Sequence, residues 1–368
     1  METFLSFVFC IINLCVSLKN PRICYDKFKA EEHKALFVFG DSLFDPGNNQ
    51  YLNGSTDEGT QATSWPYGQS FFDHPTGRLS DGRIVPDFIA QFANLALLPP
   101  YLESSVHPLI DGANFASAGA GVLAGTHPGT IHIRKQLEYF KTLKNSLKQQ
   151  LNGAEEAEKF LRRAVYLFSI GGNDYFDFYS SNPNATESDQ RAYVEMVVGN
   201  LTSVLKELYS LGARKIAFQN AGPLGCVPVM KSMNPEIGTN CLEQPLALAR
   251  LHNDYLSISL NSLQKTLPGF EHAIFDYYNS LFDRVNNPSK YGFEEGKVAC
   301  CGSGAYRAFG CGGGDGEEYE LCKNPGEYVW FDGAHTTEMA NGQLAELLWS
   351  GDASVTGPYN MKQLFEHS

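Results

Sequence analysis

Short apolar runs alternate with longer amphipathic segments along most of the chain, and this order restricts the possible folds more than any other feature. Five short apolar runs read as buried strands, the first of them with β-branched and aromatic residues: 35–39, 112–116, 164–170, 215–219 and 273–277. Apolar residues at three- and four-residue spacing predict helices over 133–151, 193–211 and 243–267. Strands that alternate with helices predict a parallel sheet covered on both faces, with ligands bound beyond the carboxyl ends of the strands.

The chain has 368 residues, which is enough for two average domains. However, no linker rich in Pro, Ser or charge interrupts the alternation, and the sequence shows no internal repeat. We therefore expect one α/β domain over residues 34–352, followed by a C-terminal tail over 353–368. The Gly-rich stretch 302–316 contains a cysteine and is predicted to be a surface loop tethered by disulfides.

Residues 4–16 form a mostly apolar stretch that is too short to span a bilayer as a helix and is followed by the small residue Ser17. This pattern predicts a secretory signal over 1–17, with cleavage as late as about residue 24. Because no positive charge precedes the apolar stretch, an uncleaved anchor stays an alternative. Glycosylation acceptor triplets begin at Asn53, Asn184 and Asn200. Together these features predict a secreted glycoprotein.

Nine cysteines are present, of which Cys10 and Cys15 lie in the predicted signal. The other seven fit neither paired zinc-ligand spacing nor a CxxC redox motif, so disulfides in an oxidising compartment are expected. We predict a bond between Cys226 and Cys241 and leave Cys24 unpaired. Two further bonds are expected among the last four cysteines, whose pairing the sequence leaves open: Cys300, Cys301, Cys311 and Cys322.

Composition excludes several classes of protein. Hydrophobic residues make up 43% and charged residues 19%, as in ordinary globular proteins rather than disordered or multi-span membrane chains. Lys and Arg total 28 against 41 Asp and Glu, a net charge of -13, and no basic tract is present. We therefore expect neither a nucleic-acid partner nor a stable membrane span.

Ser42 is the first candidate for chemistry, because it comes directly after the predicted strand 35–39 within Gly40-Asp-Ser-Leu43. A tight turn there would expose the hydroxyl at the edge of the sheet. A serine nucleophile also needs a general base and a third group that orients the base. The alternative is that Ser42 only caps the next helix.

Asp332 and His335 lie three residues apart near the C-terminus. This spacing places both on one side of a turn, where the carboxylate can accept a hydrogen bond from one imidazole nitrogen while the other faces a serine. Alternatively, Asp332 is a helix cap and His335 a surface residue. The other histidines show no ligand spacing and no His-Glu-x-x-His occurs, so no metal site is predicted.

Asn173 and Gly119 are candidates for binding an oxyanion. Asn173 follows two glycines after the predicted strand 164–170 and offers an amide donor, although the same residues suit an ordinary turn. Gly119 can present a backbone N–H. It also begins a match to the dinucleotide fingerprint, but the match lies mid-chain and Glu138, at the distance of the ribose ligand, falls in a Lys-rich helix. We therefore expect no nucleotide cofactor.

The motifs around these residues, taken in order, resemble those of the GDSL lipase/esterase family of SGNH hydrolases: Gly40-Asp-Ser-Leu43, Gly119, Gly171-Gly-Asn-Asp174 and Asp332-Gly-Ala-His335. No Gly-x-Ser-x-Gly elbow of other α/β-hydrolases occurs. Segments such as Pro66-Tyr-Gly and Ala299-Cys-Cys-Gly302 are similar to the plant branch of the family. One departure is Thr336, where the family usually has proline, from which we expect only a small effect on helix entry.

The resemblance implies a single flavodoxin-like, three-layer α/β/α domain and a serine esterase or lipase acting on lipid or small acyl esters without a cofactor. Ser42 would attack the ester, His335 would take its proton, and Asp332 would orient His335. The N–H groups of Ser42 and Gly119 and the Asn173 amide would bind the oxyanion. Two alternatives stay open, an acyltransferase that uses an alcohol acceptor and a non-catalytic defence or binding protein. The expected location is extracellular, at the cell wall in a plant, with the vacuole as an alternative.

Overall fold

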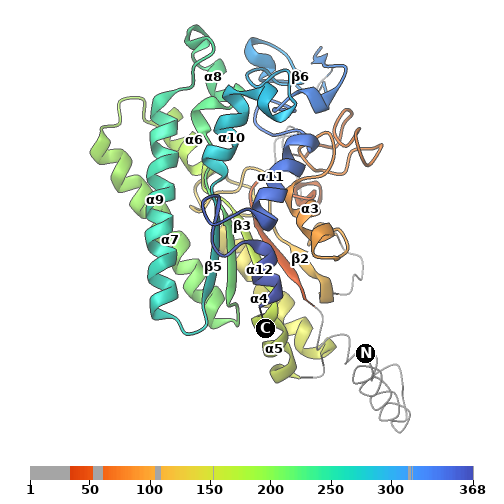
Figure 1. The fold of residues 1–368 in the computed structure, drawn as a ribbon, viewed down its shortest axis with the longest axis vertical. Coiled ribbons are helices and arrows are strands. Elements are labelled where there is room, and N and C mark those ends of the chain that lie inside the picture. The colour runs from red at the N-terminus through yellow and green to blue at the C-terminus, as the bar shows by residue number, and fades with distance from the viewer. Residues whose placement is uncertain are drawn as a thin grey trace.

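A six-stranded sheet in the order β2-β1-β3-β4-β5-β8 forms the centre of the computed structural model (Figure 1). Its strands are β1 (Leu36–Gly40), β2 (Gly112–Asn114), β3 (Val165–Ser169), β4 (Lys215–Gln219), β5 (Glu271–Phe275) and β8 (Thr356–Pro358). The first five are parallel, and β8 pairs with β5 in the antiparallel direction. The order 2-1-3-4-5 is that of flavodoxin-like folds, so the predicted α/β fold is confirmed.

The structure describes residues 34–52, 61–103, 109–151, 153–313, 316 and 318–367. Three predictions lie outside these residues: the signal over 1–17, the unpaired Cys24 and the acceptor Asn53. Residues 353–368, which the sequence analysis set apart as a tail, contribute β8 and helix α12 (Met361–Glu366) to the domain. Both pack against β5, because β5 would otherwise be an open sheet edge.

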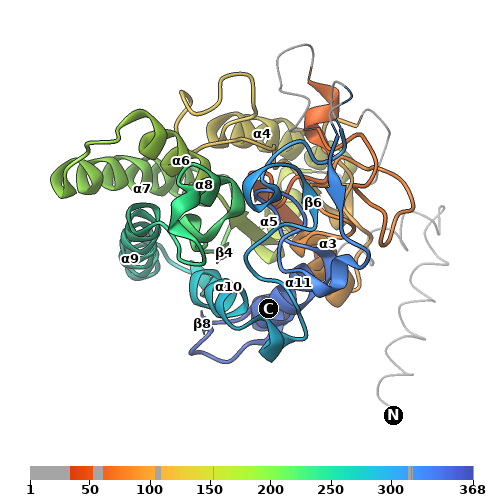
Figure 2. The same cartoon turned by 90° about the horizontal axis from the view of Figure 1, so that it is seen from above.

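Two layers of helices cover the sheet (Figure 2). One layer contains α4 (Ile133–Gln150), α7 (Glu187–Ser210) and α9 (Glu243–Thr266), with α5 (Ala154–Arg163) beside α4. The other contains α3 (Val85–Phe92), α10 (Tyr277–Asn286), α11 (Glu338–Ser350) and α12. Helix α7 begins six residues before its predicted start at 193, because Thr186 and Asp189 form a capping box there.

The core lies where the central strands meet both layers. Every residue of β1, β3 and β4 is buried, which explains why at least three consecutive apolar residues lie in each strand and polar residues do not alternate with them. Aromatic rings stack across neighbouring strands, with Phe168 of β3 lying 4.8 Å from Phe39 and 5.0 Å from Phe218, measured between ring centroids. The rigid sheet fixes the turns at its carboxyl edge.

Three disulfides join Cys226 to Cys241, Cys300 to Cys322 and Cys301 to Cys311. The predicted bond between Cys226 and Cys241 and the two bonds among the last four cysteines are confirmed. The tethered Gly-rich segment also contributes to a two-stranded sheet of β6 (Cys301–Gly302) and β7 (Glu320–Leu321). This segment packs beyond the carboxyl edge of the main sheet (Figure 1).

Candidate active site

The turn after β1 holds Ser42 at the carboxyl edge of the sheet. The Asp41 N–H donates to the Ser169 carbonyl of β3 at 3.1 Å. On the other side, the Gln136 amide of α4 accepts from Gly40 N at 2.9 Å and donates to Gly40 O at 2.7 Å. A Cβ at position 40 would lie 2.5 Å from the Ser169 carbonyl oxygen, so only glycine allows this close approach. Ser42 is left half-buried at the rim of a pocket.

The loop that carries Gly119 is tied to the Ser42 turn by Asp45. Its carboxylate accepts hydrogen bonds from Gly47 N at 2.7 Å, Asn48 N at 2.6 Å and Ala118 N at 2.8 Å. Burial raises the pKa of Asp45 to about 6, against the effect of these bonds. Gly119 itself has φ +80°, in the left-handed region that favours glycine. The backbone at Gly119 is thereby fixed relative to Ser42.

Asn173 lies at the start of α6 (Gly172–Ser181), directly after β3. Its amide donates one hydrogen bond to the Ala120 carbonyl at 3.0 Å, which leaves its second N–H available. The neighbouring Asp174 accepts from Val122 N at 2.8 Å and from Leu123 N at 2.9 Å. These bonds join the Asn173 turn to the Gly119 loop.

Asp332 and His335 form a hydrogen-bonded pair. His335 Nδ1 lies 2.7 Å from Asp332 Oδ1 and 2.9 Å from Oδ2. The Tyr67 hydroxyl donates to Asp332 Oδ2 at 2.9 Å, and the His335 N–H donates to Oδ1 at 2.8 Å. Burial opposes ionisation of Asp332, but attraction and hydrogen bonding to His335, helped by Tyr67, outweigh it and lower its pKa. The carboxylate is therefore held ionised, and the other imidazole nitrogen, Nε2, is left for chemistry.

The chain after His335 is fixed by a loop far away in sequence. The Ser80 hydroxyl donates to the Thr336 carbonyl at 3.0 Å, and Arg83 pairs with Glu338 at 2.6 Å. Thr336, which stands where the family usually has proline, donates from its hydroxyl to Asn341 Oδ1 at 2.6 Å. Thr337 then caps α11. Helix entry is thus stabilised by side-chain hydrogen bonds instead of a proline.

A pocket of about 200 Å³ brings the predicted residues together: Ser42, Gly119, Asn173 and His335 all line it. Asp332 does not line the pocket but is hydrogen-bonded to His335. The rest of the lining is largely apolar and comes mainly from Leu43, Leu79, Phe176, Leu224, Val227 and Leu281. Asp41 also faces the pocket, and its burial raises its pKa to about 7. In the part of the chain that the structure describes, no hydrogen bond joins Ser42 Oγ to His335, as is common before substrate binds.

Comparison with known proteins identifies the family of the chain. Residues 36–348 match the family model described as GDSL-like lipase/acylhydrolase. The chain belongs to this family. It is 45% identical to GDSL esterase/lipase 1 of Arabidopsis thaliana over 368 residues, which cover 98% of each chain. It is 48% identical to GDSL esterase/lipase 2 of the same plant over 340 residues, covering 90% of this chain and 89% of the relative.

A GDSL lipase of Tanacetum cinerariifolium is 46% identical over 355 residues, covering 96% of this chain and 92% of the relative. Family membership together with these relatives makes the protein a carboxylic ester hydrolase. Among the described residues, no group of three His, Cys, Asp or Glu side chains could hold a metal ion. None of the helices described combines the length and apolarity that a membrane span requires.

Several residues that support this GDSL site were not predicted from the sequence. Tyr67 contacts Asp332 across 265 residues, and Gln136 contacts Gly40 across 96, so no local spacing could reveal either contact. The sequence gives a weak signal for Tyr67, which lies in the family-like segment Pro66-Tyr-Gly, and none for Gln136. The two glycosylation acceptors that the structure describes are not part of the pocket lining: Asn184 is exposed between α6 and α7, and Asn200 is half-buried in α7.

Proposed function

We propose that this GDSL hydrolase cleaves esters through an acyl-enzyme on Ser42. The observation that carries the proposal is that Ser42 and His335 line the same pocket. Asp332, which does not line the pocket, is hydrogen-bonded to Nδ1 of the His335 imidazole. His335 Nε2 takes the hydroxyl proton as Ser42 Oγ attacks the carbonyl carbon, and Asp332 stabilises the imidazolium. His335 then returns the proton to the leaving alcohol. Water, activated by His335, hydrolyses the acyl-enzyme.

Three donors in the same pocket support an oxyanion hole. In the described structure neither Ser42 N nor Gly119 N donates to a protein acceptor, and one N–H of the Asn173 amide is also uncommitted. Such donors stabilise the negative charge that develops on the carbonyl oxygen, and one of them is worth about 10²–10³-fold in rate. Ser42, Gly119 and Asn173 are the residues to which we assign this role.

The proposed substrates are esters of short acyl chains. A pocket of about 200 Å³ is smaller than the typical ligand site of roughly 300–1,000 Å³. Its apolar wall, formed in part by Phe176 and Leu281, favours an aliphatic acyl group over a charged one. We expect kcat/KM to be highest for p-nitrophenyl esters of short acids and to fall for the palmitate.

We also propose that the protein is secreted and glycosylated. The three disulfides fit an oxidising compartment, and the predicted signal over 1–17 supplies the route of export. Asn184 is the most accessible acceptor described, whereas the Asn200 amide already donates to Met196 O at 2.9 Å. A glycosidase that removes N-linked glycans should shift the mass of the protein secreted from a eukaryotic host, and Asn184→Gln should remove part of that shift.

The test is hydrolysis of p-nitrophenyl butyrate by the secreted protein and by an equally folded Ser42→Ala variant. We expect the activity to disappear in the variant. Equal activity in both would refute the assignment of Ser42. Repeating the assay with an alcohol acceptor decides between a hydrolase and an acyltransferase, because a transferase would form the new ester in place of free acid.

A further inference from the structure

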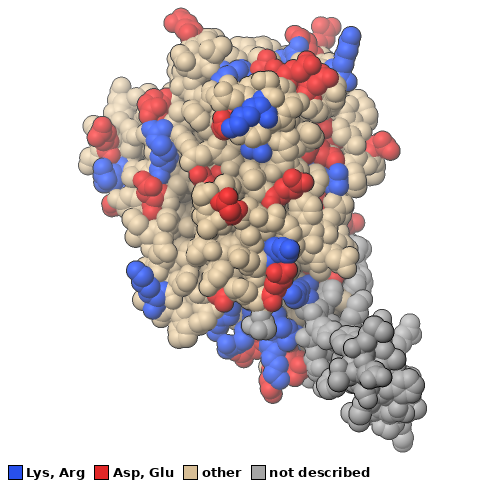
Figure 3. All heavy atoms as spheres, viewed as in Figure 1, with Lys and Arg blue, Asp and Glu red and all other residues tan. Residues whose placement is uncertain are grey.

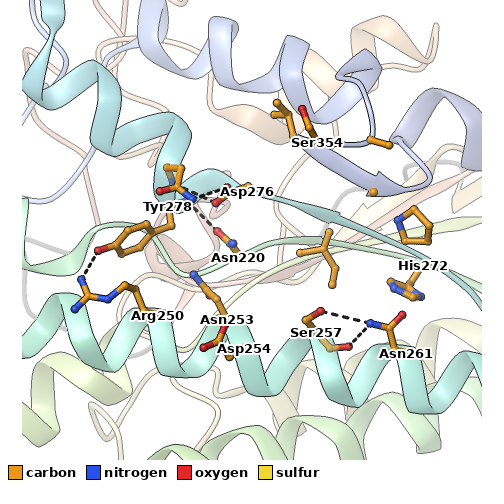
Figure 4. Close-up of a pocket in the computed structure, with 16 residues that line it drawn as sticks. Asn220, Arg250, Asn253, Asp254, Ser257, Asn261, His272, Asp276, Tyr278 and Ser354 are labelled. Carbon is orange, nitrogen blue, oxygen red and sulfur yellow. Dashed lines mark hydrogen bonds between the residues drawn. The ribbon is translucent and has the colours of Figure 1, made fainter.

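A second, larger cavity lies outside the proposed active site. It is a groove of about 600 Å³ between α9 and the β5–β8 edge of the sheet (Figure 4). Its floor includes His272 and Ile274 of β5, and its far wall includes Pro358 of β8. Because β8 pairs only with residues 273–275, this edge is not built up by a further long strand. Nothing in the proposed ester hydrolysis uses the groove.

One face of α9 supplies polar side chains along the groove: Arg250, Asn253, Asp254, Ser257 and Asn261. Their three- and four-residue spacing places them in a row, and at 1.5 Å per residue the row is roughly 16 Å long. The apolar residues of α9, such as Leu256 and Leu260, face the core instead. The row is thus long enough to contact several units of an extended ligand.

Hydrogen-bonding capacity remains at the floor and rim of the groove. His272 is only 1% exposed, and its Nδ1 has no hydrogen-bond partner. Burial lowers the pKa of His272 to about 4, so at neutral pH the ring offers one donor and one acceptor. Figure 4 places this ring beside Asn261, whose amide N–H donates to Ser257 O at 2.9 Å and whose Oδ1 accepts no hydrogen bond from the described residues.

The charges of the groove do not favour an anion. Arg250, its one guanidinium, already pairs with Glu243 and donates to the Tyr278 hydroxyl at 2.9 Å. Asp254 and Asp276 add negative charge to the lining. Over the face shown in Figure 3, basic side chains are interspersed with acidic ones. A ligand here would exchange neutral hydrogen bonds, and no cation site of three His, Cys, Asp or Glu side chains occurs among the described residues.

We propose that this groove binds a neutral oligosaccharide. Sugar hydroxyls both donate and accept hydrogen bonds, which matches the mixture of amides, hydroxyl and neutral imidazole along α9 and β5. Sugar rings also present C–H faces, for which Ile274, Val355 and Pro358 offer apolar contacts. The groove does not depend on the ester chemistry, because its residues are separate from those of the proposed active site.

Calorimetric titration of the full-length Ser42→Ala protein with cellotetraose, maltotetraose and mannotetraose tests the proposal without turnover. We expect at least one of them to bind, and Asn261→Leu to weaken that binding about 5- to 10-fold, the loss expected for a neutral hydrogen bond. Asn145→Leu, at an exposed asparagine on α4, is the matched control and should bind like the parent. A tetramer of galacturonic acid should bind more weakly.

Two results would overturn the proposal: no heat from any neutral tetrasaccharide up to about 10 mM, or binding that Asn261→Leu and Ser257→Ala both leave unchanged. Both positions are partly or fully exposed, so these variants should fold. In the Ser42-containing protein, Asn261→Leu should keep the kcat/KM for p-nitrophenyl butyrate. This separates failure of the groove from failure of the proposed hydrolase mechanism.

Discussion

Replacing Tyr67 by phenylalanine tests how the histidine is held. The Tyr67 hydroxyl donates to Asp332 Oδ2 at 2.9 Å, and both residues are 5% exposed. Water cannot easily replace the hydroxyl there, so the variant loses a hydrogen bond to a buried charge, worth about 1.5–3 kcal/mol. Asp332 keeps its backbone N–H donors and its contact to His335, so the pair persists but is less firmly oriented.

We therefore expect Tyr67→Phe to lower the free energy of unfolding by about 2 kcal/mol and kcat/KM by about tenfold, since 1.4 kcal/mol corresponds to a factor of ten. Urea unfolding measures the first effect and hydrolysis of p-nitrophenyl butyrate the second.

Tyr166→Phe is the matched control for this variant. Tyr166 is fully buried near the amino end of β3, and its hydroxyl donates to Leu161 O at 2.9 Å. Loss of this neutral hydrogen bond should cost about 1 kcal/mol of stability and leave the activity of the folded enzyme unchanged. Full activity in Tyr67→Phe, or an equal loss of activity in both variants, would show that the Tyr67 hydroxyl does not orient the Asp332–His335 pair.

Three further predictions concern stability. Because the pKa of Asp41 is about 7 in the folded protein and 3.8 ordinarily, the folded state keeps a proton that the unfolded chain loses, and the free energy of unfolding should fall from about pH 4 to pH 7. Urea unfolding should show a shallower fall for Asp41→Asn, and the same pH dependence in the variant and the parent would contradict this. Lys231 is fully buried, its Nζ has no hydrogen-bond partner, and burial lowers its pKa to about 8. Lys231→Met should therefore raise the free energy of unfolding at pH 7 by about 1 kcal/mol. At pH 10 the folded lysine is largely neutral, so the gain should be smaller there, and an equal gain would show that the buried charge is not its cause. Removing the Cys226–Cys241 bond should lower the free energy of unfolding by about 3 kcal/mol, because the bond closes a loop of 15 residues, and an unchanged melting temperature would contradict this. It should also lower activity, because Leu224 and Val227 in this loop region line the pocket.

The strands were predicted well because burial on both faces leaves a strong sequence signal. β4 begins and ends at the predicted residues, and β1 is displaced by one residue. The fifth strand was placed two residues too late, since Asp276 ends it by capping α10. β8 was not predicted, because it has only three residues, two of which are glycine and proline.

The proposed site likewise contains residues that the sequence predicts and residues that it does not. Ser42 and Asn173 follow buried strands, so their place at the sheet edge could be predicted from local pattern. The contacts of Tyr67 and Gln136 depend on how distant segments pack, which one sequence does not encode in any spacing. The groove beside α9 depends equally on the position of β8, and no motif in the sequence indicates it.

The most direct test of Ser42 as the nucleophile is to treat the protein with a p-nitrophenyl alkylphosphonate and to map the adduct by mass spectrometry. Ser42 is predicted to carry a single phosphonate, which should be absent in Ser42→Ala and should form much more slowly in His335→Ala. An enzyme that hydrolyses p-nitrophenyl butyrate but carries the phosphonate on another residue, or on none, would contradict the assignment of Ser42 as the nucleophile.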